Sequence, residues 1–93
     1  MRVVNGIAYA NNEAQLLKVV SAKALSDFRL WLRFSNGDTR VFDASDLLRY
    51  PAFKELSDPK LFGDVYLDYG VPTWLDGRVD LAPEMLYENS VTV

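Results

Sequence analysis

The side chains with the clearest capacity for chemistry belong to the alternating segment 28–34. Its apolar residues share one face of an extended strand, and Arg29, Trp31 and Arg33 share the other. Guanidinium groups bind carboxylates and phosphates through paired hydrogen bonds, and an indole ring stacks beside a cation. This face therefore predicts a binding site for an anionic ligand or for an acidic partner peptide.

Asn36-Gly37 follows this segment and predicts a hairpin with a two-residue type I′ loop, because that loop needs positive φ at both positions. The register that results places Arg33 directly opposite Arg40, on the same face as Trp31. Like charges opposed across two strands are destabilising by up to ~1 kcal/mol unless something lies between them. Three explanations stay open: a carboxylate from the second half of the chain, a bound anionic ligand or acidic peptide, and a bulged register that breaks the pairing.

The second half of the chain offers acidic side chains and a further tryptophan. The acidic series is Asp58, Asp64, Asp68, Asp76, Asp80, Glu84 and Glu88. No Asp-x-Asp-x-Asp-Gly loop brings their oxygens together, so no metal site is expected. Asp76 and Asp80 fit turn or cap positions, and they are also candidates for an acidic binding surface. Trp74 is expected in the core or, alternatively, as a surface anchor for a partner.

The composition excludes several classes of enzyme. The chain of 93 residues contains no Cys and no His. Disulfides, thiol chemistry, zinc fingers, Ser-His-Asp triads and imidazole acid–base catalysis are therefore ruled out. The five Gly are scattered, one to a turn, and form no phosphate-binding loop. We expect neither a cofactor nor a metal, and no enzymatic activity.

The charges are divided unevenly along the chain. Residues 1–54 carry eight basic and five acidic side chains, a balance of +3, whereas residues 55–93 carry two basic and eight acidic ones, a balance of −6. The net charge of −3 argues against non-specific DNA binding, which depends on many Lys and Arg contacts to phosphates. Either the two halves attract each other in the fold, or the acidic half binds a basic partner. Because no membrane-length apolar run and no signal peptide are recognisable, we expect a cytoplasmic protein.

A small α+β domain must position these side chains, and the length allows a single domain, residues 1–93. We expect a small antiparallel sheet with the 28–43 hairpin at its centre and short helices packed at one end or face. Its expected strands are 18–24, 28–34 and 39–43, continued by the pair 65–68 and 72–75. Short helical segments are expected at 45–48, 52–56, 58–62 and 80–88, with Asp58 as a cap and with Pro59 and Pro83 at helix starts. Residues 1–16 form an N-terminal extension, in which Asn5-Gly6 suggests a turn.

The order of motifs along the chain resembles a known family. The stretches that carry the resemblance are Leu30-x-Leu32-x-Phe34-Ser35-Asn36-Gly37 and Asp80-Leu81-x-Pro83-Glu84-x-Leu86-Tyr87. They are similar to the bacterial domain of unknown function 2442, over residues 17–90. The resemblance implies a compact mixed α/β domain, fused in some members to a DNA-binding helix-turn-helix. It also implies genes that often neighbour a second uncharacterised family, numbered 4160, in suspected toxin–antitoxin-like pairs, and it implies no catalytic residues.

We therefore expect a non-catalytic protein-binding or regulatory module, which as an antitoxin-like protein would hold a small basic partner. The alternative is a binder of small anionic ligands or nucleic acid, through the basic and aromatic face of the 28–43 hairpin. The candidate binding residues are Arg29, Trp31, Arg33, Arg40, Trp74, Asp76 and Asp80. No membrane contact is expected, and homo-oligomerisation is left open.

Overall fold

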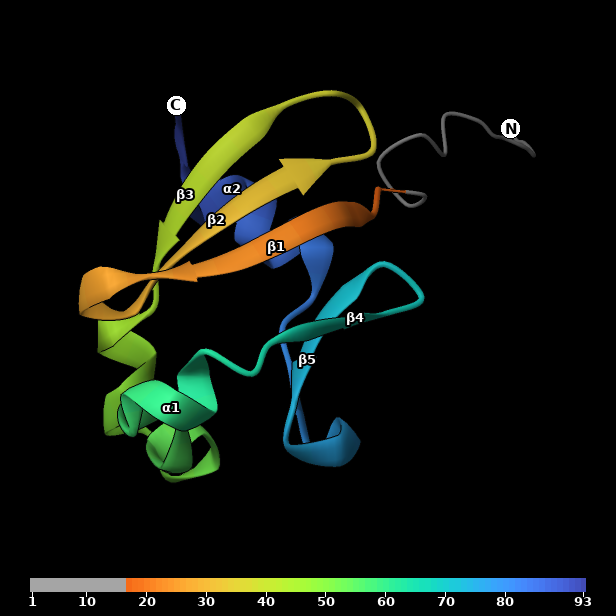
Figure 1. Cartoon of the computed structure of the whole chain (residues 1–93). Coiled ribbons are helices and arrows are strands. Elements are labelled where there is room, and N and C mark those ends of the chain that lie inside the picture. Colours follow the sequence, from red (N-terminus) through yellow and green to blue (C-terminus); the bar gives the residue numbers. More distant parts are fainter. Residues whose placement is uncertain (1–16) are drawn as a thin grey trace, which may run out of the picture.

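The computed structural model describes residues 17–93, which form two antiparallel sheets with short helices between and beside them (Figure 1). The first sheet has the strand order β1-β2-β3-β7, and the second has the order β4-β5-β6. The strands of the first sheet are β1 Val19–Leu25, β2 Arg29–Phe34, β3 Thr39–Asp43 and β7 Val91–Thr92. Those of the second are β4 Tyr66–Asp68, β5 Val71–Trp74 and β6 Val79–Asp80. The expected α+β class is confirmed.

The sequence suggested that the hairpin of β4 and β5 continues the first sheet. It instead forms a separate sheet with β6. Its loop is Tyr69-Gly70, with φ values of 51° and 82°, which is the type I′ geometry. The Val19 N–H, at the start of β1, donates to the carbonyl of Gly70 at 2.9 Å. The tip of this hairpin therefore meets the first sheet by a single backbone bond. The turn expected at Asn5-Gly6 lies outside the described residues.

Short helical segments lead from β3 to β4 and from β6 to β7. The 3₁₀ helices η3 Ser45–Arg49 and η4 Pro51–Ser57 precede α1 Pro59–Phe62, and α2 Pro83–Asn89 follows β6. Two further 3₁₀ turns, η2 Ser26–Phe28 and η5 Leu75–Gly77, follow β1 and β5. The Asp58 carboxylate accepts a hydrogen bond from the Lys60 N–H at 2.9 Å, as predicted for a capped helix that begins with proline.

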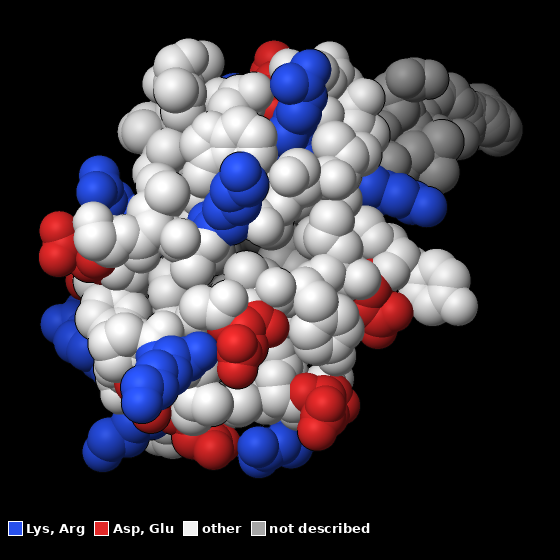
Figure 2. All heavy atoms as spheres, viewed as in Figure 1, with Lys and Arg blue, Asp and Glu red and all other residues white. Residues whose placement is uncertain are grey.

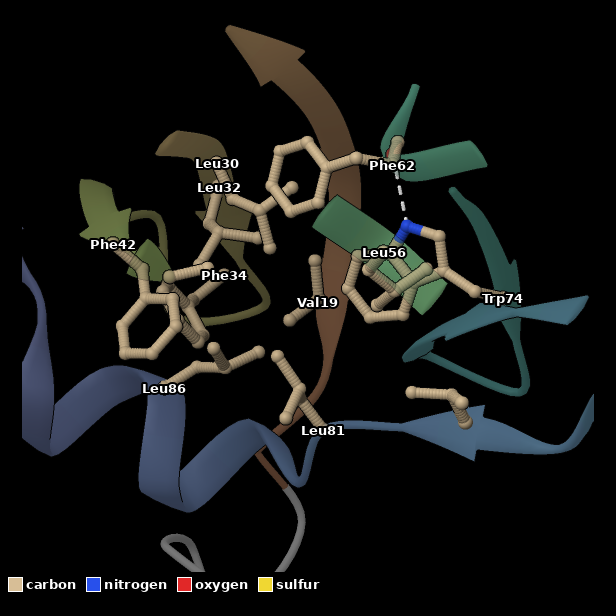
Figure 3. Packing of buried hydrophobic residues seen from close by; sticks show 12 residues of the cluster. Val19, Leu30, Leu32, Phe34, Phe42, Leu56, Phe62, Trp74, Leu81 and Leu86 are labelled. Atoms are coloured by element: carbon tan, nitrogen blue, oxygen red, sulfur yellow. Dashed lines mark hydrogen bonds between the residues drawn. The ribbon is translucent and has the colours of Figure 1, made fainter. Parts of the chain in front are cut away.

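The core lies between the inner face of the first sheet, the second sheet and the helices (Figure 3). Its buried apolar residues are Val19, Leu30, Leu32, Phe34, Phe42, Ala44, Leu56, Phe62, Trp74, Val79, Leu81 and Leu86. Trp74 has 0% exposed surface, and its indole N–H donates to the carbonyl of Phe62 at 2.9 Å, the bond drawn in Figure 3. The alternative in which Trp74 is a surface anchor is therefore wrong, because a partner could reach it only by opening the core.

The hairpin of β2 and β3 turns through three residues, Ser35–Gly37, rather than through the expected two. The Phe34 N–H donates to the Asp38 carbonyl at 2.8 Å, and the Gly37 N–H donates to the Phe34 carbonyl at 2.9 Å. Gly37 has a φ of +93°. A turn closed by a glycine in the left-handed region is the common three-residue alternative to the type I′ loop. Asn36-Gly37 thus marks the hairpin correctly but not the length of its loop.

The longer loop changes which residues face each other. Arg33 pairs with Thr39, and Arg40 pairs with Leu32, so the expected opposition of the two arginines is wrong. Because side chains alternate between the faces of a strand, a shift of one residue moves every side chain of β3 to the other face relative to β2. Arg40 consequently points to the inner side, and Val41 takes the outer position beside Trp31. Of the three explanations left open by the sequence, the third is right that the pairing is broken, but the cause is the three-residue loop, because the pairing of β2 with β3 contains no bulge.

Candidate functional site

The side of the first sheet opposite the core forms a solvent-facing surface, which we call the outer face. Strand register assigns to it Ser21, Lys23, Leu25, Arg29, Trp31, Arg33, Thr39, Val41, Asp43 and Val91. In Figure 1, α2 lies behind this sheet, on the core side, and no described element lies over the outer face. Antiparallel sheets that face water on one side normally carry polar residues there. The aromatic and aliphatic members of this surface are therefore its unusual feature.

One cross-strand row runs through all the strands of the sheet. Lys23 pairs with Trp31, Trp31 with Val41, and Val41 with Val91. The Lys23 ammonium lies 5.9 Å from the centre of the Trp31 ring, within the range of a cation–π contact. Val91 is 68% exposed, and Trp31 and Val41 are half-buried. The row therefore presents a continuous, partly apolar strip to solvent.

Three cations flank this strip: Lys23, Arg29 and Arg33. All three are exposed, and none forms a salt bridge with another side chain among residues 17–93. Figure 2, in the same view as Figure 1, shows Lys and Arg atoms standing apart on a mostly uncharged upper surface, whereas most of the visible acidic atoms lie lower down. Arg29, Trp31 and Arg33 therefore lie on one face of β2, as the alternation of the sequence predicts.

Asp43 is the acidic member of the outer face, and it is already engaged. It pairs with Arg29 across the two strands and accepts hydrogen bonds from the backbone N–H of Ser45 at 2.9 Å and from its hydroxyl at 2.7 Å. These two bonds hold the pKa of Asp43 below its ordinary value, and the charge of Arg29 acts in the same direction. Asp43 thus remains ionised and reduces the positive charge at the Arg29 end, while Lys23 and Arg33 keep theirs.

Arg40 lies on the inner side, away from this surface. Its guanidinium carbon is 4.0 Å from the centre of the Tyr87 ring, one nitrogen donates to the Ser90 carbonyl at 3.2 Å, and another is 3.7 Å from the Asp38 carboxylate. The Tyr87 hydroxyl donates to the same carboxylate. The expected carboxylate from the second half of the chain is replaced by that of Asp38, which directly follows the hairpin loop. Arg40 is therefore a structural residue in the described part of the chain.

The remaining predicted residues, Asp76 and Asp80, lie on the second sheet and its η5 turn. Both are exposed, and Asp76 adopts a φ of 56°. The other acidic residues of the second half are exposed as well, but they are distributed over η4, the cap of α1 and the turn after it, β4 and α2. Within residues 17–93 no group of three side chains could hold a metal ion. The structure does not bring these carboxylates together with the outer face.

Sequence reasoning missed Lys23, Val41 and Val91 as members of the surface. Val41 was assigned to the wrong face by the register, and Val91 joins the sheet only because the chain returns to β3 after α2. The β-branched run Val91-Thr92-Val93 is a signal for a strand that could have suggested this element. Nothing local in that run indicates its partner.

The hollows of the described surface include two that border the first sheet. One, of about 360 Å³, is lined by Ala24–Phe28 of the β1–β2 turn together with Pro59, Phe62 and Gly63. The other, of about 390 Å³, lies between β3, η3 and α2 and is lined by Phe42, Asp43, Asp46, Leu47, Met85 and Asn89. Among the described residues that line either hollow, no hydroxyl group is hydrogen-bonded to a base, so the outer face remains the stronger candidate.

The fold and this surface define a small α+β domain with one sheet face open to solvent. The chain belongs to the family described as "Protein of unknown function (DUF2442)", which matches residues 19–92. No curated protein and no solved structure matches the chain. No helix within residues 17–93 is long and apolar enough to span a membrane.

Proposed function

We propose that this domain is a non-catalytic module that binds another protein through its outer face. The observation that carries the proposal is the uncovered row Lys23–Trp31–Val41–Val91. Tryptophan and arginine are enriched among the residues that dominate binding energy at interfaces. An apolar strip rimmed by polar residues is also the usual character of a protein-binding surface.

Binding suits this surface better than catalysis does. Its side chains offer three cations and an apolar strip, its carboxylate Asp43 is already held by two hydrogen bonds from Ser45, and its hydroxyl groups on Ser21 and Thr39 have no histidine to activate them. A module that covers the surface of another protein can regulate that protein without chemistry of its own. An antitoxin-like role is one form of such regulation.

The sequence also suggested a basic partner at the acidic side of the molecule, near Asp76 and Asp80. The exposed carboxylates there support electrostatic attraction, which mainly accelerates association. The tryptophan of this side, Trp74, is buried in the core, and the exposed aromatic residues of the second sheet are the tyrosines Tyr66 and Tyr69 of the β4–β5 hairpin. We therefore favour the outer face as the principal contact and treat the acidic side as the competing outcome of the experiment.

The experiment is affinity capture from cells of the source organism, with the tagged wild-type chain and two variants. Trp31→Ala should reduce the capture of a specific partner, with an affinity loss of about 30-fold or more for an interface anchor. Tyr69→Ala is the matched control, since Tyr69 is a 91% exposed aromatic residue at the tip of the β4–β5 hairpin. The far-ultraviolet circular dichroism of each variant should match that of the wild type.

A triple variant, Asp76→Asn, Asp80→Asn and Glu84→Gln, tests the competing surface. If the triple variant loses the partner while Trp31→Ala retains it, the partner binds the acidic side and the outer-face proposal is wrong. If Tyr69→Ala loses the partner as fully as Trp31→Ala does, the outer face is likewise not the principal contact.

A further inference from the structure

We infer, resting on the proposed function, that the outer face binds an extended acidic segment of its partner protein, in which an apolar side chain is flanked two residues away by carboxylates. The inference rests on where the cations stand relative to Trp31. Arg29 and Arg33 precede and follow Trp31 by two positions on β2, and Lys23 faces it from β1.

The spacing along β2 sets the geometry of the partner. Side chains on one face of a strand repeat every two residues, or about 6.6 Å, so Arg29 and Arg33 bracket Trp31 over roughly 13 Å. An extended segment lying along β2 repeats its own side chains at the same interval. A central apolar side chain can then cover Trp31 and Val41 while acidic side chains two residues away reach the cations.

The two ends of this bracket differ in charge. Arg29 faces Asp43, whose carboxylate already neutralises part of its field, whereas Arg33 faces the uncharged Thr39. Lys23 faces Trp31 from β1, midway between Ser21, which pairs with Arg33, and Leu25, which pairs with Arg29. The stronger requirement is therefore for a carboxylate at the end of the segment that meets Arg33, while Lys23 adds positive charge at the centre. Bidentate Arg–carboxylate pairs favour this arrangement.

A nucleic acid fits this surface less well than an acidic protein segment does. Binding to single strands combines a long basic groove with stacked aromatic rings. Here one aromatic ring is followed across the sheet by Val41 and Val91, which offer aliphatic surface and no stacking platform. The net charge of −3 opposes a polyanion, while a short acidic segment needs only the local cations.

The rest of the molecular surface assists the orientation of such a partner. Residues 55–93 carry a balance of −6, and their acidic side chains are exposed. An acidic segment is repelled there and attracted at the outer face, and complementary charges of this kind improve specificity and the rate of association. The charge division along the chain thus gains a role that requires no basic partner.

The test uses random peptides displayed on phage and selected on the immobilised full-length chain. Selection on the wild type should enrich peptides in which Asp or Glu lies two positions before or after an apolar residue. Synthetic peptides of the enriched sequence should bind at least about tenfold more weakly to the double variant Lys23→Gln, Arg33→Gln, and binding should weaken with added salt. The double variant Lys54→Gln, Lys60→Gln removes the same charge from η4 and α1 and should bind as the wild type does.

Each other outcome overturns the inference in a distinguishable way. Enriched peptides that lack acidic residues but still fail to bind Trp31→Ala would refute the acidic segment and leave the proposed binding face intact. Peptides whose binding is unaffected by Trp31→Ala, or the absence of any enrichment, would refute both. A single-stranded DNA oligonucleotide that binds the wild type at physiological salt, and fails to bind the Lys23→Gln, Arg33→Gln variant, would assign the face to nucleic acid instead.

Discussion

Arg40 lies at the edge of the core and is held by groups from two elements. Its guanidinium stacks on the Tyr87 ring of α2, donates to the Ser90 carbonyl and approaches the Asp38 carboxylate. Its Nε is buried and has no hydrogen-bond partner within residues 17–93. A planar guanidinium can lie flat on a ring while its N–H groups donate within its own plane, whereas the tetrahedral ammonium group of lysine has no planar face to stack. The side chain therefore joins the hairpin loop to the C-terminal helix.

Arg40→Lys should lower the free energy of unfolding by about 1–2 kcal/mol, because it loses the stacking contact and at least one charged hydrogen bond. The matched control is Arg33→Lys on the exposed outer face, which should change stability by no more than about 0.5 kcal/mol. Urea unfolding at neutral pH measures both. Equal midpoints for the two variants would contradict the structural role of Arg40.

Asp43 predicts a pH dependence of stability. Its pKa is lowered in the folded protein by the two hydrogen bonds from Ser45, so its ionised form stabilises the native state. A carboxyl group whose folded pKa is depressed contributes its full stability above the unfolded pKa of about 3.9 and loses it as the pH falls through the folded value. The wild type should therefore exceed Asp43→Asn in stability at about pH 6, and this difference should shrink towards about pH 3. A difference that stays constant over that range would show that the charge of Asp43 is not the cause.

At the scale of elements, the two tight hairpin loops place different demands on their glycines. Gly37 and Gly70 both have positive φ, at +93° and +82°. A Cβ added at Gly37 would meet nothing within 4 Å, whereas one at Gly70 would lie 2.7 Å from the Cβ of Lys18. The second contact involves an atom fixed to the backbone, so it cannot be relieved by rotating a side chain.

Gly37→Ala should destabilise the protein by about 1 kcal/mol, the cost of a left-handed residue with a side chain. Gly70→Ala should cost clearly more, since the close contact adds to the same backbone cost and disturbs the bond between Gly70 and Val19. Chemical denaturation of the two variants provides the comparison. A smaller loss for Gly70→Ala than for Gly37→Ala would contradict the packing of the β4–β5 hairpin tip against β1.

At the scale of the whole molecule, the two sheets share one hydrophobic core. Leu30, Leu32 and Phe34 from the first sheet and Trp74 and Val79 from the second belong to the same buried cluster. A domain of this size with one core usually unfolds in a single cooperative step. The sheets should therefore not unfold separately, although within residues 17–93 a single backbone hydrogen bond joins the β4–β5 loop to β1.

Two single-tryptophan variants test this cooperativity. Trp74→Phe leaves Trp31 as the fluorescent reporter of the first sheet, and Trp31→Phe leaves Trp74 as the reporter of the second. Trp74→Phe should be the less stable variant, because the Phe62 carbonyl loses its buried donor. Within each variant, fluorescence and circular dichroism should report the same denaturant midpoint. Separate midpoints would mean that the two sheets form independent units.

The local features of this protein were predictable from the sequence. The alternation of residues 28–34 identifies a strand with an apolar and a basic–aromatic face, and Asp58-Pro59 marks the start of a helix. The turn at Tyr69-Gly70 also lies where the sequence indicates it. These features depend on neighbouring residues alone, through side-chain alternation, capping and backbone preference. The composition likewise excluded thiol and imidazole chemistry.

Only the tertiary structure decided which surface is open and what it contains. Asn36-Gly37 is compatible with loops of two or three residues, and the difference of one residue turns Arg40 inward and Val41 outward. The addition of β7 to β3 and the separation of the second sheet depend on contacts between distant segments. The burial of Trp74 follows from that separation, since its ring fills the space between the sheets. Local sequence patterns specify the period and the turns of an element, but its partner and its exposed face depend on long-range packing.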